Sequence, residues 1–126
     1  MSYNCVNRIT ITCDKIEYSY ELDYLIDELR RNNPNENGNY KNIYVLDRGT
    51  RGLVFNFSNI WNGGDFKWLE QLLEKYRHCW VKNEWSEING LAGVWVGYIN
   101  RYNQKEIKQL SWNDLTSQQK KLYFME

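Results

Sequence analysis

The alternation of hydrophobic and polar residues near the N-terminus predicts a β-strand over residues 5–13. A period of two that includes β-branched residues is typical of a strand with one buried face. One face of this strand consists of Cys5, Asn7, Ile9, Ile11 and Cys13, and the other of Val6, Arg8, Thr10 and Thr12.

The next periodic segment predicts a helix. Apolar residues recur at i, i+3, i+4 and i+7 from Leu22 to Leu29, and Tyr18 extends this stripe by one turn. Such a stripe indicates a helix with one buried face. We expect the helix to end before residues 32–34, since the residue before Pro34 avoids the α conformation. The polar residues 32–42 are expected to form a surface loop.

A hairpin and a second helix are expected in the middle of the chain. Residues 43–47 and 53–58 predict two strands joined by residues 48–52, with Leu53, Phe55 and Phe57 facing inward. The second helix is expected to begin after a tight turn at residues 61–64, with Asp65 as its N-cap. Its apolar stripe consists of Phe66, Leu69, Leu72, Leu73 and Tyr76.

The C-terminal part predicts a second hairpin, formed by residues 79–87 and 91–100 around a turn at 88–90. Gly93, Trp95 and Gly97 share one face of its second strand, so we expect the glycines to leave room for aromatic rings. A short strand at residues 106–110 follows. A last helix, capped by Asn113 or Asp114, is expected to complete a single domain of residues 1–126.

The resulting order of elements is β-α-β-β-α-β, which is the order of a ferredoxin-like, split βαβ sandwich. The expected fold is therefore α+β. It has an antiparallel sheet with two helices on one face, extended by a C-terminal strand and helix.

Several segments also resemble the YubB-like proteins, which are small ferredoxin-like proteins encoded by phages and plasmids. Residues 4–11 are similar to the family's N-C-x-N-x-x-x-I strand, and the likeness continues in scattered pieces at Phe55, Phe57, Trp61, residues 69–76 and residues 85–96. Residues 62–64 stand where that family has a proline-rich segment. The resemblance implies a ferredoxin-like fold and a mobile-element origin. It implies no catalytic residues, because the activity of the family is unassigned.

Charge and composition narrow the classes of partner. The chain has 16 basic and 16 acidic residues, so its formal net charge is zero, and this disfavours general binding to duplex DNA. No stretch approaches the roughly 20 apolar residues of a membrane span. Cys5 and Cys13 lie too far apart on one strand for a disulfide. These features favour a protein of the reducing host cytoplasm.

The sequence offers no site for catalysis. His78 is the only histidine, and the spacings of metal-binding or phosphate-binding motifs are absent. We expect His78 and Cys79 to have structural roles, and carboxylates such as Glu84 and Glu87 to lie on solvated faces. No enzymatic activity, cofactor or metal is therefore expected.

Aromatic residues are abundant, with six tryptophans and ten tyrosines. With helices on one face of the sheet, the other face can present aromatic side chains, unless the C-terminal segment folds over it. Which side of the 91–100 strand is exposed stays undecided, because both its faces are apolar. The candidate binding residues are Trp80, Lys82, Glu84, Trp95, Tyr98, Arg101, Trp61, Arg48 and Arg51.

Three functions are compatible with these features. The first is inhibition of a host defence protein, such as a nuclease or effector, by direct protein binding. The second is sequestration of a cyclic-nucleotide defence signal at an oligomer interface, with bases on Trp or Tyr and phosphates on Arg48, Arg51 or Arg101. The third is binding of single-stranded RNA or DNA by the sheet face, against which the zero net charge counts.

Overall fold

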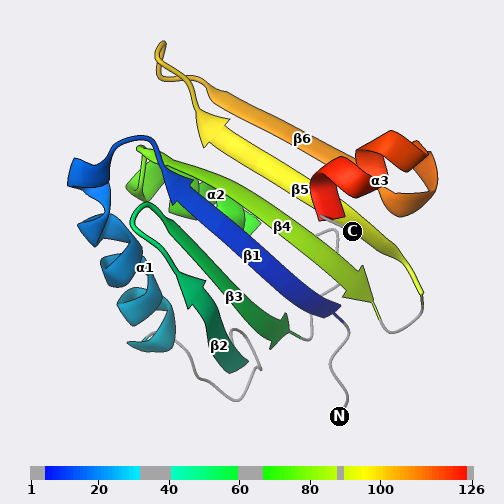
Figure 1. Cartoon of the computed structure of the whole chain (residues 1–126), viewed down its shortest axis with the longest axis horizontal. Helices are drawn as coiled ribbons and strands as arrows, with labels where there is room; N and C mark the ends of the chain where they lie inside the picture. Colours follow the sequence, from blue (N-terminus) through cyan, green and yellow to red (C-terminus); the bar gives the residue numbers. More distant parts are fainter. Residues whose placement is uncertain (1–4, 32–40, 60–66, 88–89, 125–126) are drawn as a thin grey trace.

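A computed structural model describes residues 5–31, 41–59, 67–87 and 90–124 of the chain. Within these residues, six strands form one antiparallel sheet in the order β2-β3-β1-β4-β5-β6 (Figure 1). The strands are β1 (Cys5–Cys13), β2 (Lys41–Arg48), β3 (Gly52–Asn59), β4 (Cys79–Glu87), β5 (Ala92–Ile99) and β6 (Lys105–Ser111). The helices are α1 (Tyr20–Arg31), α2 (Lys67–Lys75) and α3 (Ser117–Phe124), with 3-10 turns at Ile16–Tyr18 and Trp112–Asp114.

Helices α1 and α2 pack on the same face of the sheet, which we call the inner face. Helix α2 packs against β5 at Gly97, since a Cβ atom at this glycine would lie 2.9 Å from Cδ1 of Leu73 in α2. For α1, Arg48 of β2 lies opposite Leu53 on the inner face and reaches Asp23. The core between these layers includes Ile9, Ile11, Leu22, Leu25, Phe55, Leu69, Leu73, Val81 and Trp95.

Strand β1 confirms the alternation predicted from the sequence. Asn7, Ile9, Ile11 and Cys13 are buried, whereas the residues between them are exposed or half-buried. Asn7 is the polar member of this set. Its Oδ1 accepts a hydrogen bond of 3.0 Å from Nδ2 of Asn83, which is fully buried on the neighbouring strand β4. The two central strands are thus joined by a buried amide pair.

The structure also decides the orientation of β5. Gly93, Trp95 and Gly97 face inward, and Trp95 is only 2% exposed. A Cβ atom at Gly97 would lie 2.6 Å from the Trp95 ring, and one at Gly93 would lie 2.7 Å from the Trp85 ring. The prediction that these glycines make room for aromatic rings is confirmed.

The C-terminal segment lies against the outer face, opposite α2 (Figure 1). It covers part of β5 and β6, where Val94 is fully buried on that face. The predicted cap at Asn113 or Asp114 is wrong, because those residues belong to a 3-10 turn and α3 begins at Ser117. Thr116 is the cap: its Oγ1 accepts from the Gln119 amide, and Gln119 Oε1 accepts from the Thr116 amide, which is a capping box.

Other differences from the expected elements are small. Tyr18 lies in the 3-10 turn before α1 and does not extend that helix. Trp68 of α2 is buried and belongs to the core, a role the apolar stripe did not predict. Asp65, Phe66 and the Phe57 side chain lie outside the described residues. In the described part of the chain, no helix has the length and apolar character that a membrane span requires.

Candidate functional site

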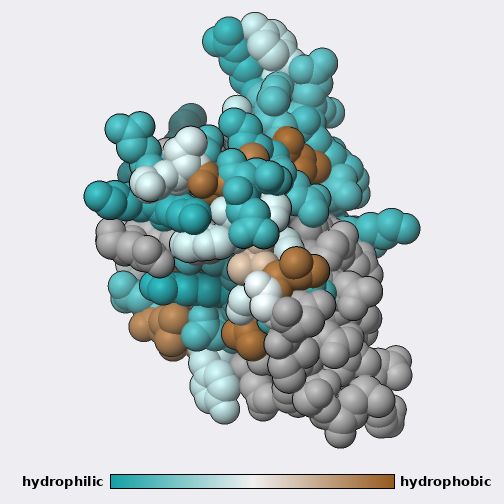
Figure 2. All heavy atoms as spheres, turned by 90° about the vertical axis from the view of Figure 1, so that its right-hand side faces the viewer, coloured by the Kyte–Doolittle hydropathy of each residue, from teal (hydrophilic) through white to brown (hydrophobic). Residues whose placement is uncertain are grey.

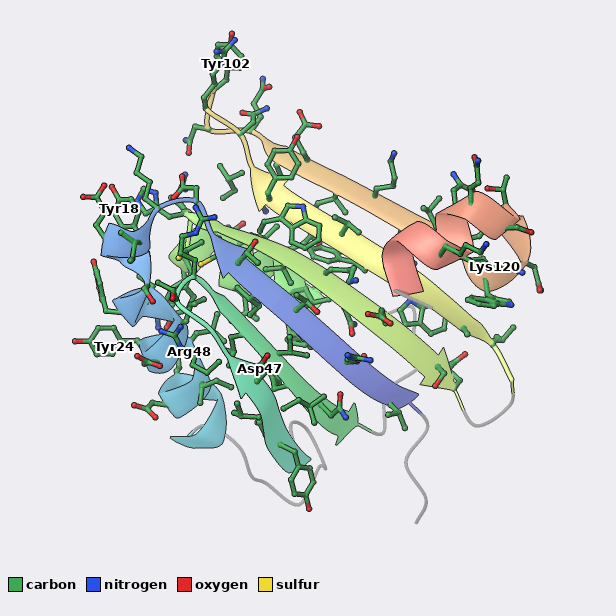
Figure 3. All side chains as sticks on the ribbon, viewed as in Figure 1. Tyr18, Tyr24, Asp47, Arg48, Tyr102 and Lys120 are labelled. Carbon is green, nitrogen blue, oxygen red and sulfur yellow. The ribbon has the colours of Figure 1, made fainter. Side chains whose placement is uncertain are left out.

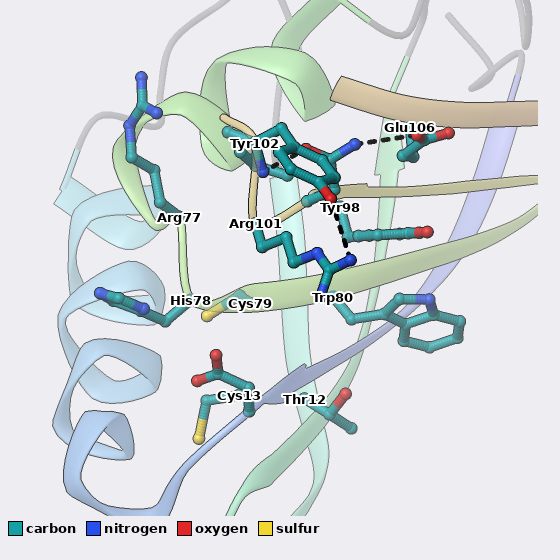
Figure 4. A pocket seen from close by; sticks show the side chains of 13 residues that line it. Thr12, Cys13, Arg77, His78, Cys79, Trp80, Tyr98, Arg101, Tyr102 and Glu106 are labelled. Atoms are coloured by element: carbon teal, nitrogen blue, oxygen red, sulfur yellow. Dashed lines mark hydrogen bonds between the residues drawn. The ribbon is translucent and has the colours of Figure 1, made fainter. Parts of the chain in front are cut away.

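A pocket of about 560 Å³ lies at one end of the sheet, where β1 ends and β4 begins (Figure 4). Three segments that are distant in the sequence form it: the end of β1, the turn from α2 into β4, and the end of β5 with its loop into β6. Its lining consists of Thr12, Cys13, Asp14, Arg77, His78, Cys79, Trp80, Tyr98, Ile99, Asn100, Arg101, Tyr102 and Glu106.

The register of the sheet brings two aromatic side chains together in this pocket. Val81 lies opposite Gly97, so Trp80 and Tyr98 are neighbours on the outer face. Thr12 lies opposite Trp80 on one side, and Glu106 lies opposite Tyr98 on the other. Trp80 is half-buried and Tyr98 is 41% exposed. The Trp80–Tyr98 pair therefore offers aromatic surface to a bound molecule.

The loop between β5 and β6 is shaped by its first residue. The side-chain oxygen of Asn100 accepts hydrogen bonds from the amides of Tyr102 and Gln104, at 2.9 and 3.0 Å. Asn103 has a φ of 64°, a left-handed conformation that asparagine tolerates. Nδ2 of Asn100 also donates to Glu106 Oε1 at 3.0 Å. The loop is thus held in one conformation by its own polar side chains.

This loop places Arg101 at the pocket. Its guanidinium carbon lies 4.9 Å from the centre of the Tyr102 ring, and its Nη2 donates to the Tyr102 hydroxyl at 2.9 Å. A guanidinium has five N–H donors, so Arg101 keeps donors for an anionic ligand. Tyr102 itself projects from the tip of the loop (Figure 3).

Arg77 supplies a second guanidinium at the edge of the pocket. It precedes β4, and its Nη1 donates to the side-chain oxygen of Asn103, which links the α2–β4 turn to the β5–β6 loop. The next residue, His78, stacks on Tyr18 with ring centroids 3.6 Å apart and an interplanar angle of 6°. The lining of the pocket also includes two acidic residues, Asp14 and Glu106.

The thiol of Cys79 closes the inner side of the pocket. Burial, with smaller contributions from Glu21, Cys13 and Asp14, raises its pKa to about 12. It therefore stays protonated at neutral pH and is a weak nucleophile. Among the described residues, no group of three or more histidine, cysteine, aspartate or glutamate side chains could hold a metal ion.

The structure brings three of the candidate residues together and separates the others. Trp80, Tyr98 and Arg101 line the pocket. Lys82 and Glu84 continue along the outer face of β4, but they form a largely buried ion pair of 3.3 Å with each other. Trp61 lies outside the described residues.

One of the remaining candidates is corrected, and two others lie outside the pocket. Trp95 is on the inner face and buried in the core, so it has no surface to offer a ligand. Arg48 is held by α1: it donates to Asp23 Oδ1 at 3.1 Å and to the Ser19 carbonyl at 2.9 Å (Figure 3). Arg51 lies nearer the pocket, where its Nη1 donates to the Asp14 carbonyl at 3.2 Å.

Sequence reasoning missed Arg77, Tyr102 and Glu106. A signal for the loop residues was present, since Asn100 and Asn103 flank Arg101 and Tyr102 in a polar segment between two strands, as turn residues do. No sequence pattern connected this loop to residues 12–14 or 77–80.

The chain was also compared with known proteins. Comparisons with protein-family models, with curated proteins and with solved structures find no match.

Proposed function

We propose that the protein is a non-enzymatic binding protein, and that its pocket takes a small ligand with a planar ring and an anionic group, as in a nucleotide. The observation that carries this proposal is the Trp80–Tyr98 pair next to Arg101 in one pocket of about 560 Å³. This volume lies within the usual range for small-molecule sites, roughly 300–1,000 Å³. Aromatic rings stack on bases whatever their identity, and guanidinium groups bind phosphates through paired hydrogen bonds.

Two features favour binding over catalysis. The His78 ring is engaged in its stack with Tyr18, and the pKa of the neighbouring Cys79 thiol is raised to about 12. Neither residue is therefore arranged as an activated base or nucleophile. The pocket's polar groups are suited to orienting a ligand.

The distribution of charge favours a small ligand over a nucleic-acid strand. A strand needs a row of cations that follows its backbone. On the outer face, Lys82 is paired with Glu84, and Glu106 borders the pocket. The two arginines at one end of the sheet are enough for one or two phosphate groups. A cyclic nucleotide, as expected for a sponge of a defence signal, belongs to this class.

The topology supports a ferredoxin-like assignment, which we include in the proposal. The strands β2-β3-β1-β4 are adjacent and antiparallel, with α1 between β1 and β2 in the sequence and α2 between β3 and β4. This is the arrangement expected of a split βαβ sandwich, extended at the β4 side by β5 and β6.

Titration with nucleotides tests the function. We expect a nucleotide from a panel of mono-, di- and cyclic dinucleotides to change tryptophan fluorescence and to release heat in calorimetry. Replacing Tyr98 with alanine should weaken binding about tenfold, because stacking contributes about 1–3 kcal/mol per base. Arg101→Gln should weaken it about 10- to 100-fold, through loss of a charged hydrogen bond.

Tyr44→Ala provides a matched control for Tyr98→Ala. Tyr44 is an exposed tyrosine on the same outer face, opposite Asn56 and at the far edge of the sheet, so its loss should leave affinity unchanged. If no nucleotide binds at millimolar concentration, or if Tyr44→Ala weakens binding as much as Tyr98→Ala, the proposed ligand site is wrong.

Inhibition of a host protein is the second candidate, and a surface on α1 favours it. Tyr20 and Tyr24 are 56% and 59% exposed and meet edge to face at 5.7 Å. Tyr24 points away from the sheet (Figure 3). Exposed tyrosines are frequent in protein interfaces. By contrast, the coloured residues on the side that faces the viewer in Figure 2 are mostly hydrophilic, with hydrophobic residues in small scattered groups.

A pull-down from host lysate tests this second candidate. The wild-type chain should retain one protein in stoichiometric amount, and the Tyr20→Ser/Tyr24→Ser double variant should retain at least tenfold less, because it lacks the aromatic anchors. Tyr102→Ser, which removes an exposed tyrosine of the β5–β6 loop and leaves α1 unchanged, is the control. Equal recovery with all three chains would exclude the α1 surface.

A further inference from the structure

Two cysteines from different parts of the chain face each other across the sheet. The register of β1 and β4 places Cys13 directly opposite Cys79. The amide of Asp14 donates to the carbonyl of His78 at 2.9 Å, which marks Cys13 and Cys79 as a non-hydrogen-bonded pair of the ladder. In such pairs the Cα atoms are about 4.5 Å apart. This separation is within the range of about 4.4–6.8 Å that disulfides span.

Both residues are present as free thiols on the inner face, and both line the pocket. Cys13 donates a weak hydrogen bond from Sγ to the Lys15 carbonyl at 3.3 Å. Breaking that bond costs little, since thiols are poor donors. The pocket gives a small reagent a route to side chains that the helices otherwise cover.

We propose that Cys13 and Cys79 form a reversible cross-strand disulfide, with a low-molecular-weight disulfide as the oxidant. The thiolate of one cysteine attacks the oxidant, forms a mixed disulfide and releases one thiol. The thiolate of the other cysteine then attacks the protein sulfur of the mixed disulfide and releases the second thiol. The two cysteines lose their hydrogens and are oxidised, while the oxidant is reduced to two thiols.

The environment of the pair slows this reaction but favours its product. The pKa of Cys79 is raised to about 12, chiefly by burial and further by the nearby carboxylates of Glu21 and Asp14. The thiolate is therefore scarce, and formation of the bridge should take minutes to hours. Burial also disfavours the Cys79 thiolate, so the reduced pair gains no thiolate stabilisation against oxidation from Cys79.

The bridge would join the two strands that carry Thr12 and Trp80. If the pocket binds a nucleotide, as proposed above, oxidation would fix one wall of that site and change its affinity. This consequence rests on the proposed function, whereas formation of the disulfide does not.

Peptide mapping of the full-length chain tests the bond itself. Trypsin places Cys5 in residues 1–8, Cys13 in residues 9–15 and Cys79 in residues 78–82, so each pairing gives a distinct linked peptide. After treatment of the folded protein with oxidised glutathione, we expect residues 9–15 linked to 78–82. The intact mass should fall by two hydrogen atoms. The midpoint of thermal unfolding should rise by on the order of 10 °C, because the bridge closes a long loop.

Three controls make the result decisive. Cys5→Ser should form the same bridge, whereas Cys13→Ser and Cys79→Ser should form none. Recovery of both thiols unmodified, or of separate glutathione adducts without the linked peptide, would overturn the proposal. Nucleotide titration of the reduced and bridged forms keeps the two ideas separate. A bridge without any nucleotide binding contradicts the proposed function alone, and binding without a bridge contradicts the disulfide alone.

Discussion

Replacing Trp95 with alanine should lower the free energy of unfolding by about 3–5 kcal/mol, the usual cost of truncating a buried aromatic side chain. The indole is 2% exposed and fills the space above Gly97, where α2 packs on the sheet. Alanine would leave a cavity between β5 and Leu73 that neighbouring side chains fill only in part. Urea unfolding followed by circular dichroism would measure the loss.

Tyr98→Ala is the matched control on the same strand. Tyr98 lies on the outer face and is 41% exposed, so its truncation should cost less than about 1 kcal/mol. Ligand binding should show the reverse order, because Tyr98→Ala should lower the affinity more than Trp95→Ala does. A Trp95→Ala variant as stable as Tyr98→Ala would mean that β5 has the reverse orientation.

Gly93→Ala should destabilise the protein by about 3 kcal/mol, at the upper end of the cost of overpacking. A Cβ atom at this position would lie 2.5 Å from the backbone oxygen of Leu110 and 2.7 Å from the Trp85 ring. A side chain can rotate away from such a contact, but the oxygen belongs to β6, which is paired with β5. Relief would therefore require the two strands to separate. Thermal and urea unfolding would both measure the change.

Gly49→Ala is the control for this substitution. Gly49 lies between β2 and β3, and a Cβ atom there would meet nothing within 4 Å. Its replacement should change the free energy of unfolding by no more than about 0.5 kcal/mol. Equal losses for the two variants would show that the cost at Gly93 comes from the backbone and not from crowding.

The sequence predicted individual elements well where one face of a strand or helix is clearly apolar. The alternation from Asn7 to Cys13 correctly predicted a strand with one buried face. In β5 the same reasoning failed to choose a face, because Val94 and Val96 are as apolar as Trp95. What decides the choice is the packing of α2 against Gly97, a contact between residues distant in sequence.

The candidate site was also predicted only in part from the sequence. Trp80, Tyr98 and Arg101 could be named from their residue types and strand positions. Their assembly depends on β1, β4 and β5 being adjacent, and on the register that sets Trp80 beside Tyr98. Pairing between strands that are distant in the sequence depends on the packing of the whole sheet. Local hydrophobic periodicity carries no information about it. The cap of α3 differs, since Thr116 and Gln119 already have capping-box spacing in the sequence.

The buried amide pair of β1 and β4 has a consequence for how these strands align during folding. The alternation of apolar and polar residues disfavours a shift of the β1–β4 register by one residue, because that shift would turn every apolar side chain outward. It does not reject a slip of two residues, which keeps the same faces buried. A slip of two residues that sets Asn7 opposite Glu87 would separate Asn7 from Asn83 and leave buried amide groups without their partner, at about 1–3 kcal/mol for each group. A slip of two residues in the other direction would set Asn7 opposite Asn83. The polar pair thus disfavours one of the two slips that the hydrophobic pattern treats as equal to the native alignment.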